Sequence, residues 1–177
     1  MKKLFEISLL FFLCLTLCAC PYSSAYYLDE TSGMNVQDAL LGKWTTYMKK
    51  PGSSGEEEIY LSLSKKTDTE YHISITGNLN ELRPYRVLIS DSLTGTAFMS
   101  LVDNRQFLNI NINSRIYIAE LKLKDDKLSL LPLAENFTGK MVRNTADLRK
   151  WVEVRFKTRV RPLLVVDVGL QNIVKLN

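Results

Sequence analysis

The sequence predicts a mainly β domain, folded as an antiparallel barrel or sandwich, and three observations predict it. Several short segments alternate apolar and polar residues, which is the pattern of strands that bury one face. Clusters of turn-forming residues separate these segments at short and regular intervals. The chain has 177 residues, which is enough for one domain with a sizeable core.

The first expected elements are a short helical turn that ends near Gly42 and a strand over 44–48. Alternation over 59–64 and over 71–76 predicts a hairpin with one buried face. Turn residues separate each of the later segments from the next one. Further strands are expected at 83–90, 94–102, 107–113, 116–124 and 128–133.

The pattern changes after Pro132. We expect a short helix over 134–142, and a second helix that begins at Asn144 or Thr145, since both residue types cap helices. Beyond it, the apolar residues again occur in short runs. Two more strands are therefore expected at 163–168 and 173–176.

Gly42 and Trp44 form a Gly-x-Trp sequence that resembles the signature of lipocalins and related calycin barrels, in which the tryptophan plugs the closed barrel end. The stretches 106–108, 130–133 and 145–149 are similar to those of a class of small uncharacterised bacterial lipoproteins with lipocalin-like domains. This resemblance implies a lipocalin-like, antiparallel up-and-down β-barrel with one or two short helices after the main strands.

The resemblance covers roughly 38–156 and has no counterpart for the tail 159–177, which we expect to close the barrel or to cover its mouth. A barrel of about eight strands either holds one small apolar ligand or is filled by its own side chains. Inward-facing Phe98, Phe107 and Tyr117 would fill it. If the barrel is hollow, the candidate lining residues are Trp44, Tyr60, Tyr71, Phe98 and Tyr117.

The N-terminus has the order of zones found in an export signal. Lys2 and Lys3 precede an apolar run over 4–17, which is shorter than the ~20 residues of a membrane span. Leu17 and Ala19 then stand before Cys20 as in a lipobox. That resemblance implies that Cys20 receives a diacylglycerol and that the signal 1–19 is removed. The alternative is an ordinary secreted protein.

This assignment divides the chain into a signal (1–19), a lipidated, flexible tether (20–34) and one barrel domain (35–177). The three cysteines are Cys14, Cys18 and Cys20, so the mature domain keeps no free thiol and no disulfide. We expect the protein in the bacterial cell envelope. Pro21 occupies the position where an Asp would indicate inner-membrane retention, which favours the outer membrane.

The net charge of the chain is +4 and falls to about +3 when Lys2, Lys3 and Glu6 leave with the signal. A charge this small gives no case for nucleic-acid binding. Basic residues are concentrated over 140–161, either as a solvated face or as a contact for anionic lipid heads or an acidic partner. The candidate contact residues there are Arg149, Lys150 and Arg155.

The sequence offers no catalytic equipment. His72 is the single histidine and falls on the polar side of its strand, so it builds neither a metal site nor a Ser-His-Asp triad. We expect no enzyme, no metal and no cofactor. The predicted function is a membrane-anchored envelope lipoprotein that binds a small hydrophobic ligand in its barrel. The alternative is a filled barrel that binds an envelope protein through the stretch 140–161.

Overall fold

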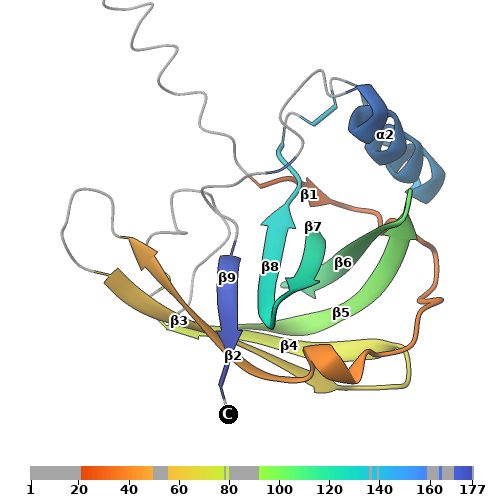
Figure 1. Ribbon diagram of the computed structural model, residues 1–177. Coiled ribbons are helices and arrows are strands. Elements are labelled where there is room, and N and C mark those ends of the chain that lie inside the picture. Colours follow the sequence, from red (N-terminus) through yellow and green to blue (C-terminus); the bar gives the residue numbers. More distant parts are fainter. Residues whose placement is uncertain are drawn as a thin grey trace, which may run out of the picture.

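A computed structural model of the chain describes residues 21–49, 56–77, 79, 92–135, 137–138, 140–158, 164 and 170–176. Its framework is a barrel of antiparallel strands with one α-helix outside it (Figure 1). A short strand β1 (Ser23–Ser24) and a 3₁₀ turn η1 (Asp38–Leu40) precede the barrel, and the helix is α2 (Thr145–Thr158). The barrel strands are β2 (Gly42–Lys49), β3 (Glu56–Lys65), β4 (Glu70–Gly77), β5 (Ser92–Val102), β6 (Arg105–Ile112), β7 (Arg115–Lys124), β8 (Lys127–Pro132) and β9 (Leu170–Lys175).

The strands β2 to β8 pair in sequence order, each antiparallel to the next. β9 follows α2 in the chain and inserts between β8 and β2, where Ile173 pairs with Leu128 and Lys175 pairs with Trp44. Eight strands thereby close an up-and-down barrel within the described part of the chain. The predicted fold class is confirmed, and the tail supplies the closing strand.

Two-residue turns connect the strands from β5 to β8. Asp103 and Asn104 take positive φ angles of 50° and 60°, and Asp125 and Asp126 take 51° and 57°. Asn and Asp tolerate this conformation, and such turns match the natural twist of a hairpin. Both turns lie where turn residues were expected between strands, and β6 begins directly after the first of them, at Arg105.

Alternate residues of each strand point into the barrel. On β3, Ile59, Leu61 and Leu63 are all buried in one apolar core, as their spacing predicted. Tyr71 and Ile73 of β4 join the same core, whereas His72 between them is exposed. The period-two pattern therefore identified the inward face of the first hairpin correctly.

A second apolar core lies outside the barrel, between the strands β5 to β7 and the elements that cover them. Phe107 and Ile118 point outward, and Leu148 and Val152 of α2 are buried in the same cluster. Figure 1 shows α2 and the N-terminal segment on this side of the barrel. The outward faces of β6 and β7 are therefore buried as well, which corrects the expectation of Phe107 as an inward side chain.

Only one of the two helices expected after the main strands is present among the described residues. Asn144 caps α2, because its Oδ1 accepts a hydrogen bond of 2.8 Å from the Asp147 N–H. The helix predicted over 134–142 is wrong: Ala134 instead forms a β-bridge with Pro21, and Phe137 is buried in the outer core. The β-bridge of Ala134 and the burial of Phe137 outweigh the weak helical tendency of the residues over 134–142.

The predicted strand 83–90 and all but Leu164 of the strand predicted at 163–168 lie outside the described residues, as do the signal and Cys20. Leu164 forms a single bridge with Leu133. No helix in the described ranges is long and apolar enough to cross a membrane.

Candidate functional site

The barrel holds a partly open cavity of about 90 Å³ at the end where β8 stops and β9 starts. Its walls come from the inward faces of β4 to β9 and from Pro21, which lies at this end of the barrel. The lining includes Pro21, Leu93, Ile110, Tyr117, Ala119, Leu130 and Leu170.

The cavity wall is almost wholly hydrocarbon. Among its described lining side chains, the Tyr117 hydroxyl is the single polar group. An apolar cavity of this kind stays dry and accepts apolar guests, since water needs polar partners to enter. Its volume is well below the roughly 300 Å³ at which cavities for drug-sized ligands begin. The space therefore suits a short apolar group or the end of a hydrocarbon chain.

The opposite end of the barrel is closed by η1. Trp44 is buried, and its Nε1–H donates a hydrogen bond of 2.9 Å to the Leu40 carbonyl. The Tyr71 hydroxyl accepts a bond of 2.8 Å from the Gln37 N–H. Burial raises the pKa of Tyr71 above its usual value. These contacts fill the closed end, so the cavity occupies only the other half of the barrel.

The five predicted lining residues separate into three groups. Tyr117 lines the cavity. Trp44 and Tyr71 point inward but belong to the closed end. Tyr60 and Phe98 are on the outer face, which corrects their prediction as lining residues.

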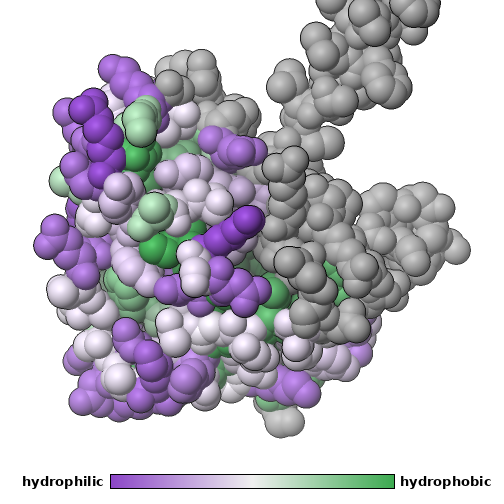
Figure 2. Space-filling view, turned by 180° about the vertical axis from the view of Figure 1, so that it is seen from behind, coloured by the Kyte–Doolittle hydropathy of each residue, from purple (hydrophilic) through white to green (hydrophobic). Residues whose placement is uncertain are grey.

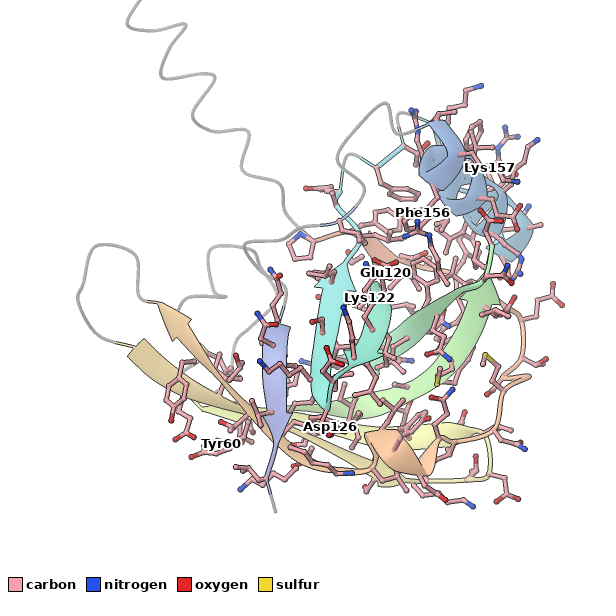
Figure 3. The ribbon with its side chains drawn as sticks, in the orientation of Figure 1. Tyr60, Glu120, Lys122, Asp126, Phe156 and Lys157 are labelled. Atoms are coloured by element: carbon pink, nitrogen blue, oxygen red, sulfur yellow. The ribbon has the colours of Figure 1, made fainter. Side chains whose placement is uncertain are left out.

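Tyr60 points away from the barrel interior (Figure 3) because its neighbours Ile59 and Leu61 are the inward residues of β3. Its hydroxyl donates a hydrogen bond of 2.6 Å to Glu58, which lowers the pKa of that carboxyl. The Lys43 Nζ lies 4.6 Å from the centroid of its ring. Tyr60 is thus part of a surface cluster on β2 and β3.

Phe98 is buried on the outside of β5, because Ala97 and Met99 take the inward positions. Its ring lies 5.1 Å from the ring of Tyr27, centroid to centroid. Phe98 therefore supports the N-terminal segment rather than a ligand.

The N-terminal segment 21–34 is not a free tether, which corrects the sequence prediction for its described residues. Pro21 bridges Ala134, and the Tyr22 N–H donates a bond of 2.7 Å to the Leu133 carbonyl. β1 then pairs with the part of β7 that lies beyond the end of β8. The first residue after Cys20 is therefore fixed to the barrel.

Side chains hold the rest of this segment. Asn109 is buried on the outside of β6, and its Oδ1 accepts a bond of 2.8 Å from the Leu28 N–H. Its Nδ2 donates to Ser100 Oγ at 2.7 Å. Further along the segment, Asp29 forms an ion pair with Arg149 of α2. The segment and α2 thus form one layer on the barrel.

The predicted contact residues of the basic stretch differ in exposure. Arg149 is bound internally, to Asp29 and to the Leu101 carbonyl, the latter at 2.7 Å. Arg155 is partly buried, and its Nε has no hydrogen-bond partner among the described residues. Lys150 is exposed. Of these three residues, Lys150 alone is exposed and available to contact a partner.

Sequence reasoning missed a buried carboxylate on the outer face of β7. Glu120 is 1 % exposed, and its two oxygens each lie 2.9 Å from a cation, Arg105 Nη1 and Lys122 Nζ. The Arg105 guanidinium also covers the Phe156 ring, 4.4 Å from its centroid. In the sequence, Glu120 interrupts an apolar run, and this interruption was the signal that could have indicated a buried carboxylate. The cluster joins β6, β7 and α2 and is a structural ion pair.

The described residues contain no group of three His, Cys, Asp or Glu side chains that could hold a metal ion. No family model, no curated protein and no solved structure matches this chain. The function is therefore argued from the cavity and the surfaces.

Proposed function

We propose that the mature protein is a lipid-anchored envelope protein whose barrel holds a small apolar group, such as the end of an acyl chain. The apolar cavity beside Pro21 carries this proposal. Cys20 is the neighbour of Pro21 in the chain, so their Cα atoms are about 3.8 Å apart. An acyl-bearing cysteine would place hydrocarbon at the same end of the barrel as the cavity.

The anchor is supported by the sequence before Pro21. The run over 4–17 and the order Leu17, Ala19, Cys20 are typical of an export signal that ends in a lipidated cysteine. A single acyl chain gives only marginal membrane binding, whereas the two chains of a diacylglycerol on Cys20 would anchor the protein stably.

Binding is supported by the cavity chemistry rather than its size. Tyr117 offers a single hydroxyl at the wall, and the other lining side chains, such as Leu93 and Leu130, can only exclude water. Each methylene group moved from water into such a site contributes about 0.8 kcal/mol. The protein would act as a carrier or sensor of an apolar group without catalysing a reaction.

The alternative, an envelope protein bound through the stretch 140–161, has weaker support. Arg149 already forms internal bonds to Asp29 and Leu101, and Arg155 is partly buried. Two of the three candidate contacts are thus engaged with or covered by the protein itself.

The anchor is tested by metabolic labelling with an alkyne fatty acid in a bacterial host. Cys20→Ala should remove the label, and the matched variant Cys18→Ala should keep it. Labelling that persists in the Cys20 variant would refute the anchor.

The cavity is tested by native mass spectrometry and by titration of the purified protein with dodecanoic acid. Ala119 lines the cavity, so Ala119→Leu fills the space, whereas Ala146→Leu makes the same change on the exposed surface of α2. We expect the Ala146 variant to bind like wild type and the Ala119 variant to bind at least about tenfold more weakly, since the guest loses most of its contact area. Equal binding by both variants, or no binding by wild type, would refute the cavity hypothesis.

A further inference from the structure

We propose that the outer surface of α2 and the segment before it rest on anionic lipid headgroups of the membrane that anchors Cys20. This face, which we call the basic face, consists of Lys140, Met141, Arg143, Lys150 and Lys157. The proposal rests on the proposed function for the lipid on Cys20, and it adds the surface that meets the membrane.

The basic face lies close to the point where the chain leaves the barrel. The rings of Tyr22 and Phe137 are in contact, with centroids 4.8 Å apart. Lys140 follows Phe137 by three residues, which span at most about 11 Å. Since Tyr22 follows Cys20 by only two residues, the lipid and Lys140 are confined to one end of the molecule.

The N-terminal segment leaves no slack between the lipid and this end. Pro21 is paired with Ala134, and β1 is paired with β7, so the segment cannot extend as a spacer without breaking these bonds. A lipid inserted next to Pro21 therefore brings this end of the barrel against the headgroups. Figure 1 shows α2 at the same end, beyond the tip of β8.

The charges of the basic face point away from the barrel. Asp147 and Lys150 lie three residues apart on α2, and Lys157 lies two turns beyond Lys150 on the same side. Arg143 lies just before the helix, with its Nε 3.9 Å from Asp147 Oδ2. Lys140, Arg143, Lys150 and Lys157 are exposed, against two half-buried carboxylates, Asp147 and Glu153, which pair with Arg143 and Arg149 respectively. Figure 2 shows hydrophilic residues gathered over α2.

Met141 gives this face an apolar tip. Its side chain is 80 % exposed, the largest exposure among the large hydrophobic residues described. It stands between exposed Lys140 and Arg143, and the Lys140 Nζ lies 5.0 Å from the centroid of the Trp151 ring. An exposed apolar side chain flanked by cations is disfavoured in water, whereas both find partners at an anionic lipid surface.

The test uses the chain from Pro21 to Asn177, which keeps every described contact and lacks both signal and lipid. Vesicles contain either equal amounts of phosphatidylglycerol and phosphatidylcholine or phosphatidylcholine alone. The test variant is Arg143→Glu with Lys150→Glu. The control is Lys124→Glu with Lys127→Glu, which makes the same charge change in the β7–β8 hairpin, at the other end of β8. Circular dichroism confirms that each protein is folded.

We expect co-sedimentation with the phosphatidylglycerol vesicles only, weakened roughly 30-fold in the test variant and little changed in the control. Equal losses in both variants would show a response to net charge and overturn the proposal. So would equal binding to both kinds of vesicle, or no binding to either, and the last result would favour an acidic protein partner. Because this protein carries no lipid, the result is independent of the Cys20 labelling test.

If the truncated chain does not fold, the lipidated protein is used instead, and its fluorescence is compared between two labelled positions on the same vesicles. Met141→Cys carries an environment-sensitive fluorophore on the exposed tip. A blue shift on phosphatidylglycerol vesicles that is absent from a label at Lys124→Cys supports the basic face, and equal shifts at both positions contradict it.

Discussion

Pro21 and Ala134 form an antiparallel β-bridge, so the first described residue of the chain is paired with the residue two positions beyond β8. β8 pairs with the second part of β7, and β1 pairs with the first part, beyond the end of β8. The bridge lies at the junction between these two pairings. The N-terminal segment is therefore part of the sheet rather than an appendage. Its stability would decide how closely the barrel lies to the lipid that we propose on Cys20.

Asn109 is expected to be the main side-chain support of this segment. Asn109→Ala leaves the Leu28 N–H and the Ser100 hydroxyl without their present partner, and an unsatisfied buried polar group costs about 1–3 kcal/mol. We expect a loss of about 2 kcal/mol in the free energy of unfolding, measured in urea. Asn35→Ala, at an exposed position, is the control. Equal losses in the two variants would show that Asn109 has no such role.

Gly95 is expected to tolerate no side chain. A Cβ there would lie 2.0 Å from the Asn111 carbonyl oxygen, because the backbones of the paired strands β5 and β6 lie very close together at this point. Gly95→Ala should lower the free energy of unfolding by more than about 2 kcal/mol, since backbone and not a flexible side chain must move. Gly33→Ala meets nothing within 4 Å and should be neutral or slightly stabilising. The thermal unfolding midpoints of both variants are measured, and similar midpoints would contradict the close backbone approach at Gly95.

Tyr71 makes the stability depend on pH in the alkaline range. Burial raises the pKa of folded Tyr71, so the unfolded chain loses this proton first, from about pH 10 upward. The contribution is complete below that pH and is lost as the pH rises toward the folded pKa. Tyr71→Phe should therefore show a smaller fall in unfolding free energy between about pH 8 and about pH 11. Tyr47→Phe, at a 61 % exposed position, should fall like wild type. Identical falls in all three proteins would refute this role.

Arg105 stabilises the buried carboxylate of Glu120. Arg105→Met removes one of its two cations, and breaking a fully buried pair costs about 3–5 kcal/mol. Because the Arg105 side chain is 40 % exposed, we expect only about 1–2 kcal/mol in urea unfolding.

Two further variants check this assignment. The added change Glu120→Gln should recover part of the loss, because it removes the buried charge. Arg143→Met, at a side chain 77 % exposed, should be near neutral. A double variant less stable than Arg105→Met alone would show that the ion pair is not the source of the loss.

Local pattern was sufficient for most strands and for the hairpin turns. Ile59, Leu61 and Leu63 alternate with polar residues, so only one of their two faces could be buried. Asp125 and Asp126 tolerate the positive φ angles of their turn. These features depend on neighbouring residues alone, which is why a single sequence predicts them.

The candidate lining residues were less predictable. Phe98 stands between Ala97 and Met99, so both faces of β5 carry apolar side chains and alternation could not choose between them. The choice depends on what covers the outside, and that cover is formed by Tyr27 and α2. Tyr60 was placed inside for its aromatic ring, although the alternation around Ile59 and Leu61 already put it on the opposite face.

By itself, the sequence determined the alternating strands, their turns and a capped helix that starts at Asn144 or Thr145. Only the tertiary structure decided that the segment 21–34 packs on the barrel, that β9 closes it, and that a cavity remains beside Pro21. The reason is physical: periodicity and capping arise from residues a few positions apart, whereas barrel closure pairs Trp44 with Lys175, far along the chain. Such pairings depend on the packing of the whole molecule.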